Sequence, residues 1–260
     1  MDNKLIFRGD KISKHYGTPQ NKVLKEVSFE IYESECVGFV GESGCGKSTL
    51  ARIITHLTQA NGGDFFLKEK LMTNLSKIEK KEYYKKVQMI FQDPLSTFSP
   101  RMKINEYLLE PFINFKLSNR KGAQISVDKI MNSMKLPLEY LNKYPHELSG
   151  GELQRIVIAR AVLLDPELII CDEATSALDV TTQKQIITLL KDIQKERSFS
   201  IMFITHNLAL AEQICNKIYV MKNGKILEEI GTKSIIKDAK HLYTRQFFTA
   251  GRLGEKFCDA

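Results

Sequence analysis

The segment that most constrains the fold is Gly41 to Ser48, which reads GESGCGKS and fits the pattern G-x-x-x-x-G-K-[ST]. It follows a compact apolar strand predicted over 36–40. It precedes a predicted helix whose apolar stripe is Leu50, Ile53, Ile54 and Leu57. Glycines in such a loop let backbone N–H groups close around phosphate oxygens, and the helix N-terminus adds positive charge. An ordinary glycine-rich turn would not need this strand and helix, so the segment predicts nucleotide binding. Lys47 would reach the β- and γ-phosphates and Ser48 would hold Mg²⁺.

Strands and helices alternate along most of the chain, which favours a mostly parallel sheet with right-handed crossovers. Asn223-Gly224 suits the type I′ turn of a hairpin over 217–230, and the tail from 234 is predicted helical and basic. The region 102–145 is expected to be mostly helical, with breaks at Pro111, Gly122 and Pro137. Strands are predicted at 4–8, 23–31, 64–67, 87–91, 168–173 and 200–206, and helices at 152–164, 181–196 and 207–216, with a solvated helix in the charged run 68–86.

Composition excludes several classes of protein. With 43% hydrophobic and 27% charged residues among 260, the chain is typical of a globular protein and not of a disordered one. It contains no apolar run near the ~20 residues of a membrane helix, and its N-terminus lacks the apolar core of a signal peptide. The net charge of +7 is spread along the chain, so it does not argue for a nucleic-acid partner. Five cysteines without CxxC spacing make a disulfide framework or zinc site unlikely and favour a reducing cytosol.

Polar side chains end three predicted strands. Asp172 and Glu173 end LIICDE, His206 ends SIMFITH, and Gln92 ends VQMIF. The carboxyl ends of strands in open α/β sheets are where ligands bind. Asp172 could hold magnesium through water, and Glu173 could accept a proton from the attacking water. Without the phosphate loop, the simpler interpretation would be that Asp172 and Glu173 are solvated carboxylates and that His206 is structural.

A second glycine pair, in Leu148-Ser149-Gly150-Gly151-Glu152, opens the predicted helix 152–164. A helix N-terminus of this kind can bind anions. The chain already has one phosphate loop, so a second anion-binding turn requires either a second nucleotide or a second subunit.

LSGGELQR, placed between a phosphate loop and LIICDE, resembles the signature of ABC transporter ATPases. Four further positions match the family: Tyr16 the adenine-stacking aromatic, Gln92 the Q-loop, Asp179 in SALD the D-loop, and His206 the switch histidine. The resemblance covers about residues 4–247. It implies a P-loop NTPase fold in one domain, with a RecA-like parallel-sheet core, an N-terminal antiparallel β subdomain, a helical subdomain inserted over about 93–162 and a short helical tail over 234–260. It also implies a head-to-tail dimer in which the turn Ser149–Gly151 closes over the other subunit's ATP.

The resemblance implies ATP and Mg²⁺ as cofactors and assigns the site residues. ATP-binding positions are Tyr16, Gly41, Glu42, Ser43, Gly44, Cys45, Gly46, Lys47, Ser48, Thr49, Ser149, Gly150, Gly151, Glu152 and Asp179. Metal-binding positions are Ser48, Gln92 and Asp172, and catalytic positions are Glu173, His206 and Gln92.

Finer features are similar to the oligopeptide, dipeptide and nickel importer ATPases. They are the segment after Gln92, the run SALDVTTQKQIITLLKDIQKE, and HLYTRQFF in the tail. This resemblance implies a peripheral subunit on the cytoplasmic face of the membrane that energises import. Its partners would be a second, related ATPase, two transmembrane permeases and, through them, an extracellular solute-binding protein, with no nucleic acid. Residues Phe98 to Glu110 are candidates for the groove that receives a permease helix. Peptide, nickel and metal–chelator substrates all stay open, as does a homodimer.

Two departures and two rival functions accompany the resemblance. Glu152 stands where many members have glutamine, and Asn207 where aspartate often follows the switch histidine.

A DNA-repair or translation ATPase of this family would usually carry long coiled-coil insertions or two cassettes, and neither is present. A regulatory module without turnover is disfavoured by the intact Lys47, Glu173 and His206.

Cys45 lies inside the phosphate loop. Two interpretations of it stay open. The helix N-terminus and Lys47 would favour a reactive thiolate, or the residue is an inert filler of the loop.

Overall fold

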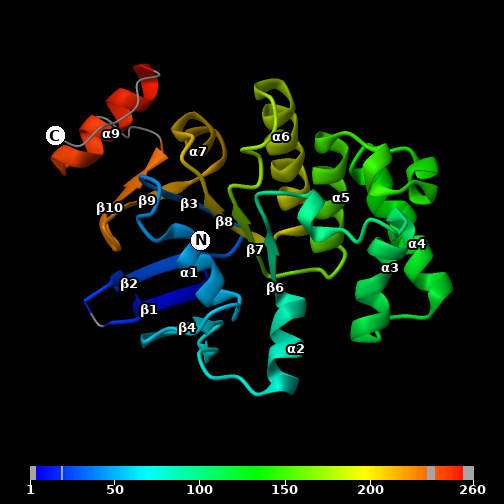
Figure 1. Cartoon of the computed structure of the whole chain (residues 1–260), viewed down its shortest axis with the longest axis horizontal. Coiled ribbons are helices and arrows are strands. Elements are labelled where there is room, and N and C mark those ends of the chain that lie inside the picture. The colour runs from blue at the N-terminus through cyan, green and yellow to red at the C-terminus, as the bar shows by residue number, and fades with distance from the viewer. Residues whose placement is uncertain (1–3, 19, 233–237, 254–260) are drawn as a thin grey trace. The chain divides into compact units, whose positions relative to one another are not determined.

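The computed structural model describes residues 4–18, 20–232 and 238–253, which fall into two compact units (Figure 1). One unit joins residues 1–76 to 200–260, and the other comprises 77–199. Among the helices within the described ranges, none is both long and apolar enough to cross a membrane. The inserted helical subdomain over 93–162 stays a prediction.

The first unit contains an antiparallel sheet, which confirms the predicted N-terminal β subdomain. Phe7 stacks on Phe29 and on Phe65, with ring centroids 6.0 Å apart in both pairs, and these rings form the core beneath the sheet. The first strand continues well beyond the predicted 4–8. The continuation pairs with β2 as far as His15, through register shifts on both sides of Ile12. The strand order is β2-β1-β4-β5, with β1 at Leu5–His15, β2 at Lys22–Tyr32, β4 at Gly62–Leu67 and β5 at Lys70–Leu71.

The second sheet of this unit is mostly parallel, as predicted, and runs β10-β9-β3-β8. Strand β3 lies parallel to both β8 and β9, and every residue of β3 and β8 is buried. Asn223 and Gly224 both have positive φ, 49° and 78°, as the type I′ turn requires. The strands are β3 (Cys36–Val40), β8 (Ser200–Ile204), β9 (Lys217–Lys222) and β10 (Lys225–Gly231).

Within the described ranges, the first unit also contains the helices α1 (Lys47–Ile54), α7 (Leu208–Ile214) and α9 (Leu242–Leu253). The prediction that Leu57 belongs to the buried stripe of the first helix is wrong. His56 adopts the left-handed conformation with φ 55°, which ends the helical path and leaves Leu57 59% exposed. The predicted helical tail begins at Leu242, and residues 233–237 and 254–260 lie outside the described ranges.

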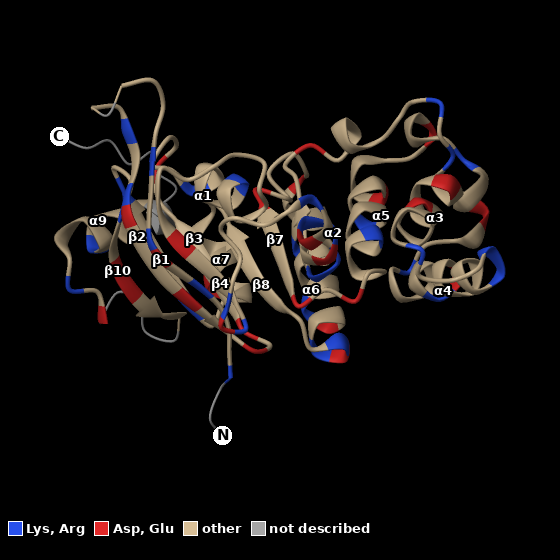
Figure 2. Cartoon of the chain, turned by 90° about the horizontal axis from the view of Figure 1, so that it is seen from below, with Lys and Arg blue, Asp and Glu red and all other residues tan. Residues whose placement is uncertain are grey.

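The second unit pairs β6 (Val87–Ile90) in parallel with β7 (Leu168–Asp172). Its α2 (Lys77–Lys86) buries only Tyr83, which confirms a solvated helix in the charged run. Basic and acidic side chains are interspersed along β1, β2 and α2 (Figure 2). The remaining helices are α3 (Ile104–Phe115), α4 (Arg120–Ser133), α5 (Gly150–Val162) and α6 (Val180–Arg197), with 3₁₀ turns at Leu95–Thr97, Leu138–Asn142 and Pro145–Glu147.

Pro111 and Gly122 do not break the helices as predicted, because they lie inside α3 and α4. A proline in a helix leaves the carbonyl four residues earlier without its usual donor. Here that carbonyl belongs to Tyr107, and the guanidinium of Arg160 donates to it. The lost backbone bond is thus replaced by a side chain of α5, and the helix continues to Phe115.

Candidate functional site

The predicted phosphate loop lies between β3 and α1. Lys47 is only 5% exposed, and its Nζ donates to the backbone oxygens of Gly41 (2.8 Å) and Glu42 (2.9 Å). A buried ammonium needs such partners, because an unpaired charge is expensive to remove from water. The loop therefore holds a cation at its centre, as a site for phosphate oxygens requires.

Two of the loop glycines, Gly41 and Gly46, have no room for a side chain. A Cβ at Gly41 would lie 2.1 Å from the oxygen of Met221, and one at Gly46 would lie 2.6 Å from Leu24 Cδ2. Gly46 also has φ 110° as the N-cap of α1. This helix start has no side-chain cap and no acidic residue in its first turn. Its N-terminal N–H groups are therefore arranged to receive an anion.

The surroundings of Cys45 argue against the interpretation of this residue as a reactive thiolate. The residue is buried, with 6% of its surface exposed. Burial raises the pKa of the thiol, and the nearby Lys47 ammonium opposes this without cancelling it. Desolvation of the anion outweighs one neighbouring charge here, which favours the inert alternative.

Tyr16 and His206 are the other predicted site residues of the first unit. Tyr16 is 44% exposed just after β1, with the Lys14 ammonium 5.0 Å from its ring centroid. His206 is exposed and follows β8. Next to it, Asn207 caps α7 by accepting a hydrogen bond from Leu210 N (3.2 Å). Asparagine and aspartate are equivalent as N-caps, so the departure at position 207 preserves this local structure.

Gln92, Asp172 and Glu173 follow the ends of β6 and β7 in the second unit. These strands pair in parallel with Ile90 opposite Cys171, so the three residues gather at one edge of the pair, as predicted. Asp172 is 9% exposed, whereas Gln92 is exposed. Glu173 has φ 49°, a left-handed conformation that costs a non-glycine residue about 1 kcal/mol.

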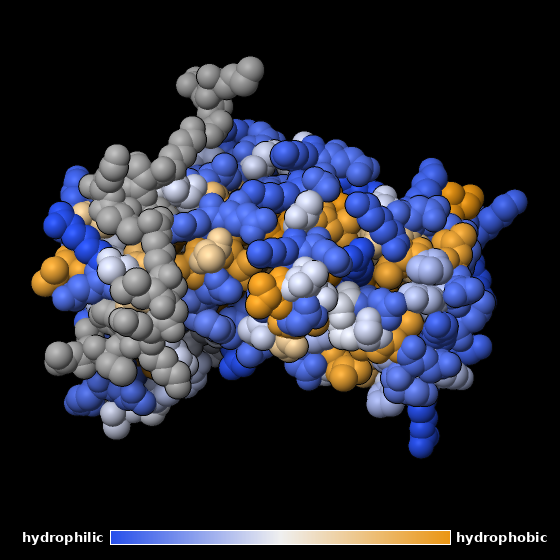
Figure 3. Space-filling view, turned by 90° about the horizontal axis from the view of Figure 1, so that it is seen from above, coloured by the Kyte–Doolittle hydropathy of each residue, from blue (hydrophilic) through white to orange (hydrophobic). Residues whose placement is uncertain are grey.

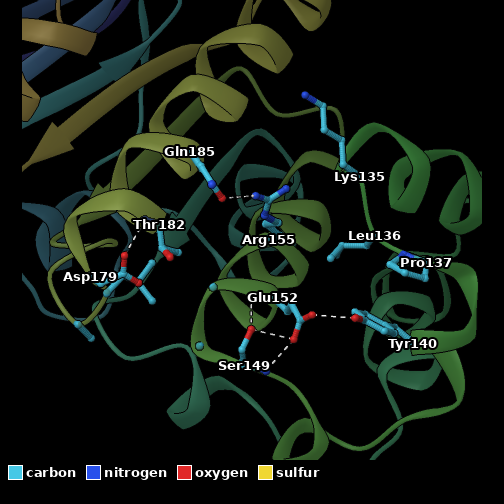
Figure 4. A pocket seen from close by; sticks show the side chains of 14 residues that line it. Lys135, Leu136, Pro137, Tyr140, Ser149, Glu152, Arg155, Asp179, Thr182 and Gln185 are labelled. Atoms are coloured by element: carbon cyan, nitrogen blue, oxygen red, sulfur yellow. Dashed lines mark hydrogen bonds between the residues drawn. The ribbon is translucent and has the colours of Figure 1, made fainter.

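The signature turn opens a cavity of about 530 Å³ in the second unit. Figure 4 shows Glu152 between Ser149 and Tyr140, with Asp179 and Thr182 across the cavity. The structure thus brings the predicted turn together with the predicted D-loop residue Asp179. The sequence analysis assigned no individual role to five further lining side chains, because folding alone brings them together around the cavity: Lys135, Tyr140, Arg155, Thr182 and Gln185.

Ser149 and Glu152 form a capping box at the start of α5. Glu152 Oε2 accepts from Ser149 N (2.8 Å) and Ser149 Oγ (2.7 Å), and its Oε1 accepts from Tyr140 Oη (2.7 Å). The bond from the backbone of Ser149 is the main reason that the pKa of Glu152 is lowered. The unusual Glu152 therefore carries a fixed negative charge inside the signature turn.

Asp179 has a structural role of its own. Its Oδ1 accepts from the N–H groups of Thr181 and Thr182, both at 3.0 Å, which makes it the N-cap of α6. Hydrogen bonding by Thr182 lowers the pKa of this carboxyl. The residue is ionised at neutral pH and fixed beside the cavity.

The remaining predicted positions fall on the phosphate loop and the first turn of α1. Ser43 and Gly44 are exposed at the tip of the loop, and Ser48 and Thr49 are half-buried on the helix. The predicted ATP-site residues are thus divided between the two units: Tyr16, the loop and His206 in one, and Gln92, Asp172, Glu173, the signature turn and Asp179 in the other.

Comparison with known proteins adds independent observations. A family model described as ABC transporter matches residues 24–176. The chain is 43% identical over 247 residues to the oligopeptide transport ATP-binding protein OppF of Haemophilus influenzae, covering 94% of this chain and 74% of that protein. It is 40% identical over 243 residues to OppF of Bacillus subtilis, covering 92% and 80%.

Among solved structures, the ATP-binding cassette MJ0796 in a dimeric post-hydrolysis state bound to ADP and Pi superposes with a TM-score of 0.78. It is 27% identical, and the match covers 88% of this chain and 99% of that one. The structure of cbiO1 from Clostridium perfringens has a TM-score of 0.81 at 23% identity, covering 96% of this chain and 98% of the other, and supports the fold alone.

Proposed function

The chain belongs to the ABC transporter family of ATPases, and from that premise we propose that it is the ATP-hydrolysing subunit of an oligopeptide importer. The observation that carries the proposal is the 43% identity to an oligopeptide transport ATP-binding protein over 94% of the chain. The relatives compared above have peptide-transport names, which favours peptides over nickel as the transported class. The following paragraphs assign the steps to residues.

The phosphate loop would hold the triphosphate. Its glycines admit phosphate oxygens close to the backbone, and the uncapped start of α1 offers N–H groups to them. Lys47 would exchange its backbone partners for the β- and γ-phosphates, since a buried ammonium pairs more strongly with an anion than with a carbonyl. The exposed ring of Tyr16 is suited to stack on adenine.

The donors of Ser48, Gln92 and Asp172 fit a magnesium ion. They are a hydroxyl, an amide oxygen and a carboxylate, and oxygen donors of this kind are the ones that Mg²⁺ binds. A magnesium ion held by these residues would supply positive charge that offsets the negative charge developing on the phosphates during transfer. Asp172 and Gln92 lie at the same edge of the β6–β7 pair, which supports their acting on one ion.

Glu173 is our candidate for the general base. Its carboxylate would accept a proton from the water that attacks the γ-phosphate. The left-handed backbone at this position gives the side chain a direction that a regular strand continuation would not give. His206, at the end of β8, would complete the site as the switch histidine.

The signature turn would act on a second subunit's nucleotide. A phosphate loop and a signature turn in one chain require a second copy or a related ATPase to complete each site. The dimeric state of MJ0796 with ADP and Pi is a precedent in a protein 27% identical. We propose a head-to-tail pair in which Ser149–Gly151 close over ATP held by the partner.

A helix of one of the two permease subunits would dock on the second unit, and the chain would then lie on the cytoplasmic face of the membrane. A groove of about 480 Å³ follows the segment around Gln92 and is lined by Phe91, Thr97, Tyr107 and Arg160, among others. Phe98, predicted to belong to such a groove, is buried and packs on the Tyr107 ring with centroids 4.1 Å apart. Apolar side chains also gather at the end that carries α3 and α4 (Figure 3). Ile113 of α3 is 73% exposed.

Reconstitution tests the proposal. The chain would be purified alone and with its permeases and partner ATPase in proteoliposomes, and ATP hydrolysis and uptake of labelled tri- to pentapeptides would be measured. We expect slow hydrolysis by the chain alone and peptide-stimulated hydrolysis in the complex, because the permeases hold two ATPases at high effective concentration. Lys47→Ala is the inactive control. Stimulation by Ni²⁺ but not by peptides would contradict the substrate class, and full activity of the lone chain would contradict the transporter role.

A further inference from the structure

The C-terminal helix contacts the phosphate loop directly. Tyr243, in the first turn of α9, donates its hydroxyl to Glu42 Oε1 at 3.0 Å. Tyr243 is buried, with 4% of its surface exposed, and it lies 201 residues from Glu42 in the chain. The sequence analysis singled out HLYTRQFF only as a family resemblance and gave it no task.

Helix α9 is held in place where it meets the loop. It lies beside β10 and α7 (Figure 1), and Glu228 of β10 accepts hydrogen bonds from Lys240 N (2.6 Å) and His241 N (3.2 Å) just before the helix. The Tyr243 ring stacks on Phe247, with centroids 5.6 Å apart, and the Lys222 ammonium lies 4.3 Å from its centroid. The hydroxyl therefore points at Glu42 from a fixed position.

The carboxylate of Glu42 lies in the loop that would bind phosphates, so its negative charge could oppose their binding. Its backbone oxygen faces Lys47, where phosphate charge would gather, and its side chain carries a negative charge one residue from Gly41. A carboxylate free to rotate toward the phosphates would repel them. The bond to Tyr243 holds that carboxylate on the side of α9. Burial, with the adjacent Glu42, raises the pKa of Tyr243, so the phenol stays protonated and donates throughout the physiological range.

We propose that Tyr243 is a positioning residue for the phosphate loop: by holding the Glu42 carboxylate against α9, it keeps that charge away from the nucleotide and sets the affinity of the loop for MgATP. This inference rests on the proposed role of Gly41–Ser48 in binding ATP. It makes the C-terminal helix part of the nucleotide site, although none of the ATP-binding positions assigned from the family resemblance lies in that helix.

A double-mutant cycle tests the inference. Tyr243→Phe removes the hydroxyl and keeps the ring on Phe247 and under Lys222. We expect the Kd of MgATP, measured by calorimetry, to rise about fivefold at low salt. The effect should disappear when Glu42→Gln is also present, because no charge is then left to hold. Raising KCl to 0.5 M should reduce the fivefold effect, since salt screens repulsion between exposed charges.

Two further variants complete the design. Glu42→Asp keeps the charge and the intact Tyr243, but it shortens the side chain out of reach of the hydroxyl, and it should weaken binding as Tyr243→Phe does. Tyr219→Phe is the matched control, because its buried hydroxyl bonds to the backbone of Glu30 and not to the loop. We expect it to leave the Kd unchanged even if it lowers the melting temperature.

The outcomes separate this inference from the proposed function. If Lys47→Ala loses MgATP binding while Tyr243→Phe and Glu42→Asp bind like the unmodified chain, only the inference fails. If Lys47→Ala itself binds MgATP normally, the assignment of the loop fails. An effect of Tyr243→Phe that persists in the Glu42→Gln background, or that salt does not reduce, would overturn the electrostatic role and leave only a packing role.

Discussion

The phosphate loop and the signature turn are both glycine-rich starts of helices, yet they present opposite chemistry. Helix α1 begins at Gly46 with no side-chain cap and no acidic residue in its first turn, and Lys47 is buried in the loop. Helix α5 begins with the Ser149–Glu152 capping box, which occupies the N–H groups of Ser149 and Glu152 and adds a negative charge. The first start has no side-chain cap, and the second is capped by its own residues.

This difference indicates which turn can bind a nucleotide by itself. Phosphate placed at α1 meets an ammonium and the N–H groups of a helix start without a side-chain cap, whereas phosphate placed at α5 meets the Glu152 carboxylate. A helix N-terminus is therefore not sufficient for an anion site. The signature turn needs a nucleotide already held and charge-compensated elsewhere, which agrees with the proposed action on a partner's ATP.

The largest expected effect is the loss of ATP hydrolysis in Glu173→Gln, which separates hydrolysis from formation of the ATP-bound dimer. Glu173→Gln removes the proposed base and keeps the shape of the side chain, so we expect hydrolysis to fall about a thousandfold while ATP still binds. With MgATP the variant should form a stable dimer on size-exclusion chromatography. Adding Ser149→Arg should return it to a monomer, because a bulky cation then blocks the turn. Normal turnover of Glu173→Gln would contradict the role of the base.

The next effect is on MgATP affinity, and it tests whether the phosphate loop and the signature turn bind different nucleotides. Lys47→Ala should weaken MgATP binding to the isolated chain about a hundredfold, because the charged partner of the phosphates is lost. Ser149→Arg should leave that affinity unchanged, because its turn serves another subunit. Calorimetry on dilute protein measures both. A loss of affinity in Ser149→Arg as large as that in Lys47→Ala would mean that the two turns share one nucleotide.

How far the sequence predicts this site depends on how local the interactions are. The loop around Lys47, the ends of the strands before Gln92 and Asp172, and the capped start at Ser149 are short segments whose residues define their own geometry. Their structure follows the prediction closely. The mostly parallel sheet follows for the same reason, because each strand shows its buried apolar run in the sequence.

The failures involve burial and partners distant in the chain. Cys45 has the neighbours of a reactive thiol, but only the fold shows that it is removed from water. Pro111 remains in a helix because Arg160, 49 positions further on, donates to the carbonyl that it leaves open. Tyr243 reaches Glu42 across most of the chain. No local pattern carries such information.

The smallest expected effect on the dimer comes from the charge of Glu152, which distinguishes the signature turn from the phosphate loop. Glu152→Gln keeps a side chain that can complete a capping box but removes the negative charge. In the Glu173→Gln background, we expect the MgATP-dependent dimer to form about threefold more tightly, because the turn then repels the partner's phosphates less. Tyr140→Phe is the matched control: it removes a bond to Glu152 and leaves the charge in place. Equal tightening in both variants would exclude the charge as the cause.

Glu152→Gln should also lower the melting temperature, by an amount that depends on pH. A charge at the first turn of a helix contributes about 0.5 kcal/mol, which corresponds to about 1–2 °C in melting temperature for a chain of this size. The pKa of Glu152 is lowered from its ordinary value of 4.5, so the folded state favours the ionised form. That contribution is complete above pH 4.5 and disappears as the pH falls through the lower folded pKa. The melting temperature of Glu152→Gln should therefore lie below that of the unmodified chain at pH 7, and the difference should vanish in more acidic buffer. A difference that is constant with pH would mean that Glu152 acts through hydrogen bonds alone. The signature turn would then no longer differ from the phosphate loop in charge.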